Sequence, residues 1–197
     1  MVLPMINPTT ITNFNRTEEE LEEFLIFAIL VAGKGAEQQA KKLDAFLNYH
    51  YPTNRRFKNK PFEYIEWLLD WNMLDIIMKE FKLGQYNRIG HAFTEIVKFK
   101  GRLKKITLEE LESIKGIGSK TARFFLLHSR KDAQFAVLDT HILKWLREQG
   151  YDAPKATPTK KKYAVLEKIF LTEAWKREML PADLDLMIWK SYATPDL

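Results

Sequence analysis

Apolar residues recur at helical spacing along nearly the whole chain, and this pattern constrains the fold more than any other feature of the sequence. The first helical segment opens at Thr17, which forms a capping box with Glu20. A second capping box, Thr107 with Glu110, opens a helix further along. The apolar positions of the first segment are Leu21, Phe24, Leu25, Ala28 and Ile29. Because the stretch AQFAVLD, residues 133–139, reads as extended and nearly everything else as helix, the sequence predicts an all-α fold.

Composition excludes several classes of protein. The chain has 197 residues, of which 46% are hydrophobic, so it suits one compact unit or two small lobes and not a disordered chain. It contains no cysteine, which excludes disulfides, thiolate metal sites and iron–sulfur clusters. The longest apolar run, FLIFAILVA, is too short to span a bilayer, and no secretory signal is visible. We therefore expect a cytoplasmic protein.

The positive charge is unevenly placed along the chain. The formal net charge is +5, yet TEEELEEF near the N-terminus is acidic, while NRRFKNK, KFKGRLKK and KATPTKKK are basic. Charge runs are usually solvated faces, but a chain that turns one face to a polyanion shows the same pattern. The charge alone allows both interpretations.

Two glycines separate two helical patterns in the stretch LESIKGIGSKTARFF. Glycine permits a sharp backbone turn and leaves no side chain over it. We expect the amides of Gly116, Ile117 and Gly118 to point outward beside a helix N-terminus and to bind phosphate oxygens of DNA. Such a contact would position DNA without reading its sequence. An ordinary glycine-capped turn between helices is the alternative.

This hairpin and the later stretch FAVLDTHILKWL together resemble the helix-hairpin-helix DNA glycosylase superfamily, the group of endonuclease III and the 8-oxoguanine glycosylases. FAILVAGKGAEQQAKKL and YNRIGHAFTEIVKF are similar to upstream parts of that family. The resemblance implies two helical lobes around a central cleft, with residues 1–34 and 139–197 in one lobe and residues 35–138 in the other. Endonuclease III and its close relatives carry a four-cysteine cluster; its absence here favours the oxidised-purine branch.

Lys120 stands directly after the hairpin, at the start of a helix. The resemblance implies that it attacks C1′ of the damaged nucleotide, expels the base and forms a Schiff base, after which β-elimination breaks the strand. Attack requires a neutral amine, and both the positive end of the helix dipole and Arg123, three residues on, disfavour the ammonium form. A solvated surface lysine is the alternative.

Asp139 lies between the extended run and the next helix, where an aspartate is a good N-cap. Capping bonds from the amides near His141 and Ile142 would fix its carboxylate. The resemblance implies a further role, in which the carboxylate stabilises the cationic character that develops at C1′ and assists proton transfer. Capping alone is the alternative.

The remaining candidate residues concern access to the base. A base inside a duplex must be flipped out before attack. The resemblance places Lys34 at the position of the residue that fills the gap, although a lysine departs from the usual glutamine; a phosphate contact is the alternative. Asp185 and Trp189 share a face of the last helix, a spacing similar to that of archaeal-type 8-oxoguanine glycosylases, where such a pair holds the base. Trp67, Trp71 and Phe124 are further candidates for the pocket, with core packing as the alternative.

The resemblance thus implies a bifunctional DNA glycosylase and AP lyase that acts on duplex DNA with an oxidised base, foremost 8-oxoguanine. We expect it to need no organic cofactor and no metal, because the four histidines show no metal-ligand spacing. We expect a monomer associated with the nucleoid. Two alternatives stay open at this point: a glycosylase/lyase for oxidised pyrimidines, and a non-catalytic helix-hairpin-helix module that binds DNA.

Overall fold

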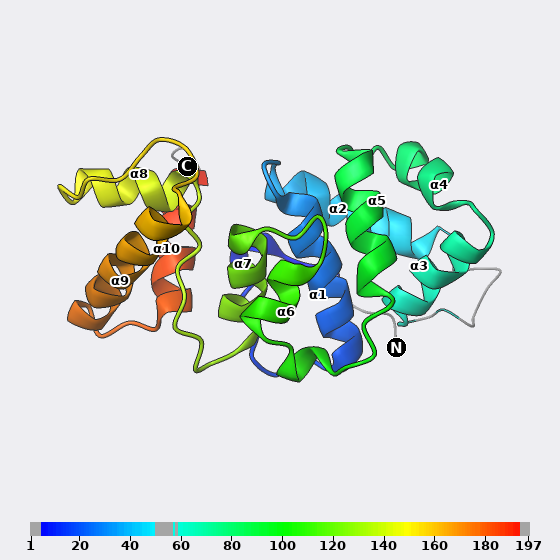
Figure 1. Ribbon diagram of the computed structural model, residues 1–197, viewed down its shortest axis with the longest axis horizontal. Helices are drawn as coiled ribbons and strands as arrows, with labels where there is room; N and C mark the ends of the chain where they lie inside the picture. Colours follow the sequence, from blue (N-terminus) through cyan, green and yellow to red (C-terminus); the bar gives the residue numbers. More distant parts are fainter. Residues whose placement is uncertain (1–4, 50–56, 58, 194–197) are drawn as a thin grey trace. The chain divides into compact units, whose positions relative to one another are not determined.

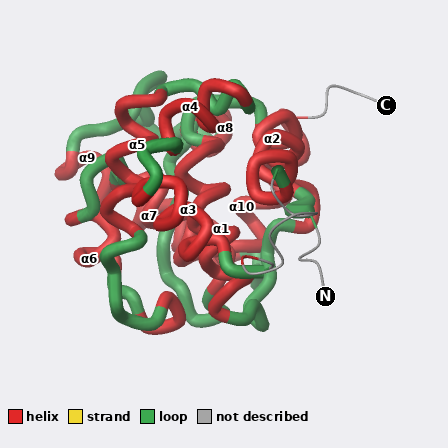
Figure 2. The backbone as a smooth tube through the Cα atoms, turned by 90° about the vertical axis from the view of Figure 1, so that its right-hand side faces the viewer, coloured by secondary structure: helices red, strands yellow, loops and turns green. Residues whose placement is uncertain are grey.

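The computed structural model describes residues 5–49, 57 and 59–193 and shows an all-helical protein. Within this described part no residue is in a strand, and loops join the helices (Figure 2). The expected all-α class is confirmed. Both predicted capping boxes form, because Thr17 accepts from the amide of Glu20 and Thr107 from that of Glu110, each with the reciprocal bond. Among the described residues, no helix has both the length and the apolar character needed to cross a membrane.

The chain divides into two compact units. Unit 1 comprises Met1–Pro8 and Asn15–Ala122, and unit 2 comprises Thr9–Phe14 and Arg123–Leu197. The first helix packs on its sequence neighbours within unit 1, and the expected lobe bounds, residues 1–34 with 139–197 and residues 35–138, stay a prediction. The arrangement of two lobes around a cleft stays a prediction.

Unit 1 is built around helix α1 (Figure 1). This helix is apolar on all sides over its second half, so it is suited to a core position, and it packs on α2, α3, α5 and η3. Large buried side chains, among them Phe27, Phe46 and Phe93, fill the space between these helices. The helices of unit 1 are α1 (Glu18–Val31), α2 (Ala36–Asn48), α3 (Pro61–Asp70), α4 (Leu74–Glu80), α5 (Tyr86–Ile96), η3 (Leu103–Lys105) and α6 (Leu108–Ser113).

Unit 2 packs its last three helices around one hydrophobic cluster, in which α10 contacts both α8 and α9. The cluster contains Trp145, Phe170 and Ile188 among its buried members. A smaller cluster joins Leu127 to the start of the last helix at Ala182. The helices are α8 (Thr140–Glu148), α9 (Lys160–Lys176) and α10 (Pro181–Ala193), while α7 (Ser119–Ser129) begins in unit 1 and ends in unit 2, and the short η1 (Pro8–Thr10) precedes α1.

Part of the acidic run near the N-terminus makes hydrogen bonds within unit 1. Glu18 accepts hydrogen bonds from the amides of Leu103 and Lys104 at the start of η3. Glu22 accepts from the amide of Phe62 at 3.0 Å and so caps α3, which has no capping side chain of its own. The run therefore fastens α1 to the N-terminal ends of two other helices.

Candidate active site

The hairpin turn between α6 and α7 requires glycine at only one of its two positions. Gly116 has φ of +98°, and a Cβ built on it would lie 2.6 Å from the backbone oxygen of Arg88. No side chain fits there, and the positive φ alone is unfavourable for other residues. A Cβ on Gly118 would meet nothing within 4 Å, so that position is open. The missing side chain at Gly118 leaves room for another molecule to approach the backbone.

The three amides that the sequence assigned to phosphate binding are not equivalent. The amide of Ile117 donates to the carbonyl oxygen of Ile114 at 3.0 Å, which closes the turn, and the Ile117 side chain is buried. Its N–H is therefore used inside the hairpin. Among the described residues, no backbone carbonyl accepts from the amides of Gly116 or Gly118. Of the predicted set, these two amides keep the capacity to bind phosphate.

Arg88 on α5 ties the hairpin to the end of α1. Its guanidinium donates from Nη1 to the carbonyl oxygen of Gly116 at 3.0 Å and from Nη2 to that of Ile29 at 2.7 Å. Its Nε donates to Gln85 Oε1 at 2.6 Å. Ile29 lies in the last turn of α1, whose carbonyls have no partner within the helix, and a cation is favourable at that end of a helix. No spacing of residues along the chain indicates this contact, since Arg88 and Gly116 are 28 positions apart.

Lys34, the expected gap-filling residue, has a partner inside unit 1. Its ammonium group donates to the carbonyl oxygen of Leu83. Burial, followed by the positive charges of Arg88 and Lys42, lowers the pKa of Lys34 from 10.5 to about 8. The side chain must leave Leu83 before it can enter a duplex. Its roles as wedge or phosphate ligand stay predictions.

Lys120 occupies the first turn of α7, as the sequence predicts. The carbonyl of Gly118 accepts from the amide of Ala122 at 3.0 Å, so the helix begins directly at the hairpin, and Lys120 itself is half-buried. Arg123, expected to influence this lysine, forms an ion pair with Glu167 at 2.9 Å and lies over the ring of Tyr163. Much of its charge is therefore compensated in place.

Asp139 is the N-cap of α8. Its Oδ1 accepts from the amides of His141 and Ile142, both at 2.9 Å, which confirms the predicted cap. One oxygen is thus bound twice, while the half-buried side chain keeps its other oxygen, Oδ2, outside these two bonds. The arrangement fixes the direction of the carboxylate.

The extended run before Asp139 is held by side chains of α9. The hydroxyl of Tyr163 donates to the carbonyl of Ala136 at 2.7 Å and accepts from the amide of Leu138 at 3.2 Å. Glu167 Oε1 accepts from the amide of Ala136 at 3.0 Å. These bonds satisfy backbone groups of the extended segment that would otherwise pair with a neighbouring strand. Sequence reasoning missed Tyr163 and Glu167, because both read as ordinary positions of an amphipathic helix.

Asp185 of the expected base pocket is paired inside unit 2. It is 6% exposed, and its Oδ2 lies 3.1 Å from Nε2 of His128, whose Nδ1 lies 2.8 Å from the hydroxyl of Thr12. Phe124 packs edge-on against the same imidazole, with ring centroids 5.0 Å apart. The structure therefore brings Asp185 and Phe124 together at His128. Trp189 lies one turn further along α10 and is half-buried.

The other two candidate tryptophans lie on α3 in unit 1. Trp67 stacks on Tyr64 with an interplanar angle of 18° and also contacts Phe57. Trp71 is 67% exposed at the end of the helix. Neither finding assigns a base contact, and their place in a pocket stays a prediction.

The structure describes the histidines and the basic runs only in part. Within the described residues no group of three or more acidic, cysteine or histidine side chains could hold a metal ion. His50 and most of the run NRRFKNK lie outside the described residues. In KFKGRLKK, Lys98 pairs with Glu95 at 2.7 Å and Arg102 with Glu18 at 3.6 Å, so part of that run is compensated by neighbouring carboxylates.

The chain matches known proteins over most of its length. A sequence model of the family described as 8-oxoguanine DNA glycosylase matches residues 9–179. A protein named 8-oxoguanine DNA glycosylase/AP lyase from Methanocaldococcus jannaschii is 30% identical over 190 residues, 89% of this chain and 81% of that protein. Proteins of the same name from Picrophilus torridus and two Thermoplasma species are 35 to 39% identical over 79 residues, which are only 37% of their own length.

Solved structures agree with this match. The M. jannaschii 8-oxoguanine glycosylase/lyase in complex with a 15mer DNA containing 8-oxoguanine superimposes with a TM-score of 0.68 at 25% identity, covering 96% of this chain and 89% of that one. The 8-oxoguanine DNA glycosylase of Thermotoga maritima gives a TM-score of 0.64 at 25% identity, with 92% and 84% covered. From its sequence and its fold alike, the chain belongs to the family of helix-hairpin-helix 8-oxoguanine DNA glycosylases.

Proposed function

We propose that this protein is a bifunctional DNA glycosylase and AP lyase that excises oxidised bases, foremost 8-oxoguanine, from duplex DNA. The observation that carries the proposal is the family match over residues 9–179, which includes a hairpin followed directly by Lys120 and a helix capped by Asp139. On this proposal the protein acts as a monomer on chromosomal DNA, in the cytoplasm at the nucleoid.

In the proposed reaction Lys120 is the nucleophile. Its neutral amine attacks C1′ of the damaged nucleotide as the bond from C1′ to the base breaks, and the base leaves with the bonding electron pair and takes up a proton. The amine loses a proton and the sugar ring opens, which gives a Schiff base between Nζ and C1′. Loss of a C2′ proton then expels the 3′ phosphate by β-elimination, and water releases the lysine.

Asp139 is the proposed carboxylate partner. A negative charge of fixed direction stabilises the positive charge that develops on the sugar while the base departs. The two bonds from the α8 amides to Oδ1 hold the carboxylate in place before the substrate arrives, so no free energy is spent on orienting it during the reaction. The amides of Gly116 and Gly118 are the proposed phosphate ligands on the hairpin, with Lys34 as a further contact to DNA.

Borohydride trapping on a duplex with a single abasic site tests the proposal. The wild-type protein should become covalently linked to DNA, because borohydride reduces the Schiff base, and Lys120→Ala should give no adduct. Lys115→Ala, which removes an exposed lysine from the same hairpin, is the matched control and should still form the adduct. An adduct with Lys120→Ala, or none with the wild type, would reject Lys120 as the nucleophile.

A panel of duplexes, each with one lesion, tests the substrate. We expect faster excision of 8-oxoguanine than of oxidised pyrimidines. Faster excision of a pyrimidine lesion would move the protein to the other substrate class, and DNA binding without any excision or trapping would leave a non-catalytic module.

A further inference from the structure

The outer side of α9 is exposed along the whole helix. Residues that follow one another at helical spacing form this side, and all of them are exposed. The opposite side is buried in the unit 2 core, through Tyr163, Leu166, Phe170 and Ala174. We call the exposed side the outer face of α9; its members are Lys161, Ala164, Val165, Lys168, Thr172, Trp175 and Lys176.

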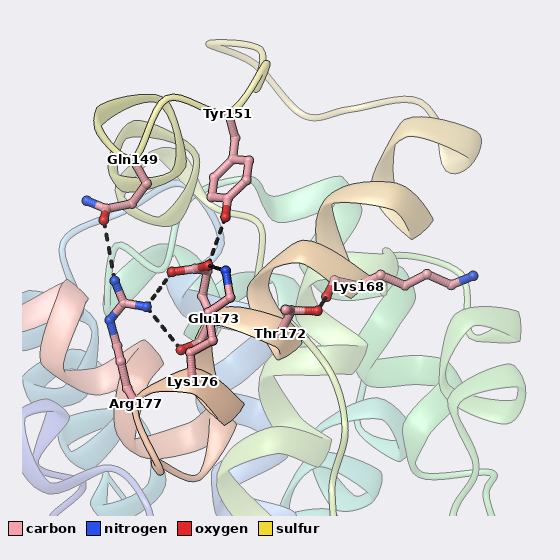
Figure 3. A network of polar contacts seen from close by, with 7 residues as sticks. All are labelled: Gln149, Tyr151, Lys168, Thr172, Glu173, Lys176 and Arg177. Carbon is pink, nitrogen blue, oxygen red and sulfur yellow. Dashed lines mark hydrogen bonds and ion pairs between the residues drawn. The ribbon is translucent and has the colours of Figure 1, made fainter.

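The outer face carries the lysines Lys161, Lys168 and Lys176, and the last of them is paired with Glu173. The acidic residues of α9 are Glu167 and Glu173, and both turn toward the protein. Glu173 accepts from Tyr151, Lys176 and Arg177, and these bonds lower its pKa to about 2. Figure 3 shows this network on one side of the helix and Lys168 extending away from it. The positive charges of Lys161 and Lys168 therefore have no acidic neighbour on their own face.

The start of α9 adds to this charge. Lys160, Lys161 and Lys162 form its first turn, where the helix dipole disfavours cations. One of them, Lys162, pairs with Asp152. The other two increase a positive potential that an anion on the outer face would relieve.

Trp175 gives the face its second property. This tryptophan is 79% exposed, although transfer of an indole ring from water into the protein interior ordinarily lowers the free energy. Trp175 lies at the same side of α9 as Lys168 and Thr172, so an aromatic ring stands in line with the lysines. Surfaces that bind single-stranded nucleic acid combine cations that follow the backbone with aromatic rings that stack on bases, and the outer face has both kinds of side chain.

We infer that the outer face of α9 binds single-stranded DNA. In a duplex both faces of each base are already stacked on neighbours, so Trp175 would find no ring to stack on, whereas an unpaired base offers one. The lysines neutralise phosphates of the same strand. The inference rests on the proposed function insofar as it takes DNA as the polyanion.

The test is the affinity for a fluorescein-labelled 12-mer of thymidines, measured by anisotropy over a range of salt concentrations. The double variant Lys161→Gln/Lys168→Gln should reduce the slope of log Kd against log salt by about 0.7 per lysine. Trp175→Ala should weaken binding roughly tenfold, while Trp175→Phe, which keeps a ring, should retain most of the affinity.

Two exposed residues of α4 provide the matched controls, Lys79→Gln for charge and Ile76→Ala for apolar surface. Both should bind the oligonucleotide as the wild type does. Unchanged affinity and slope in the α9 variants would overturn the inference. Weaker binding of these variants to duplex DNA with unchanged binding to the oligonucleotide would also overturn it, and so would equal losses of affinity in Trp175→Ala and Trp175→Phe. Trapping on the abasic duplex should be unaffected in the α9 variants, so failure of the lyase reaction and failure of this surface give different results.

Discussion

At the scale of single residues, the two hairpin glycines have different tasks. We expect Gly116→Ala to lower the free energy of unfolding by about 2 kcal/mol or more, because its Cβ would overlap the backbone oxygen of Arg88 at a positive φ. Gly118→Ala should change stability by less than about 0.5 kcal/mol, since its Cβ would meet nothing. Urea unfolding of both variants measures this difference.

Gly118→Ala should nevertheless weaken binding to undamaged duplex roughly tenfold, the size expected for loss of one charge-assisted hydrogen bond. Its methyl group would stand where a phosphate must approach the amide. Normal DNA affinity in this variant would mean that the hairpin is only a turn, which is the alternative that the sequence left open.

The proposed function gives Asp139 a chemical task beside its structural task as an N-cap, and two substitutions separate the two. Asparagine is as good an N-cap as aspartate, so Asp139→Asn should keep the stability of α8, while Asp139→Ala should lose about 1 kcal/mol. Both should excise 8-oxoguanine at least about 100-fold more slowly, because both lack the negative charge. Single-turnover excision beside urea unfolding measures the two effects. Near-normal excision by Asp139→Asn would leave Asp139 as a cap alone.

At the scale of elements, Arg88 is the contact that joins three segments of unit 1. Arg88→Met should lower the free energy of unfolding by about 2 kcal/mol, since the carbonyls of Ile29 and Gly116 lose their charged donor. Arg102→Met is the matched control: Arg102 is largely exposed and forms one loose ion pair, so its loss should cost less than about 0.5 kcal/mol. Equal effects of the two substitutions in urea unfolding would contradict a joining role for Arg88.

Local features of the helices were predictable from the sequence, whereas the contacts between them were not. The capping boxes at Thr17 and Thr107 involve residues three positions apart, so the sequence shows both partners at once. Glu22 and the α3 amide that it caps are 40 positions apart, and nothing in either segment marks the pair. The contacts of Arg88 with Gly116 and Ile29 were not predictable for the same reason, because the partners are 28 and 59 positions away along the chain.

At the scale of the whole molecule, the burial of Glu23 on α1 links stability to pH. Burial, then the nearby charges of Asp44 and Glu20, raises the pKa of Glu23 from 4.5 to about 7. The carboxyl group of Glu23 therefore binds its proton more tightly in the folded protein than in the unfolded chain. The contribution of protonated Glu23 to the stability of the folded protein is therefore fully present below pH 4.5 and is lost as the pH rises through about 7.

Glu23→Gln removes this titration. The variant should be more stable than the wild type by up to about 3 kcal/mol above pH 7, with the difference shrinking to near zero toward pH 4.5. Urea unfolding from pH 4.5 to 8 measures the difference, and Glu19→Gln on the exposed side of α1 is the control. A difference that does not change with pH would show that Glu23 is not the group responsible.

The sequence indicated the family and the fold class through short motifs, because the hairpin and the capped helix are each formed by residues that are close together in the chain. It did not indicate where the compact units divide, since that depends on how α1 packs, and an apolar helix gives no sign of its neighbours. It also did not indicate that Asp185 is paired with His128, because these two residues are 57 positions apart.

The bonds from α9 to the extended run have a consequence for solubility. An extended segment with unused backbone groups is a template on which a second molecule can add a strand, and such pairing leads to aggregates. Here Tyr163 and Glu167 occupy the backbone groups of Ala136 and Leu138 that a neighbour would need. The side chains that hold the run before Asp139 therefore also make these backbone groups unavailable to a second copy of the protein.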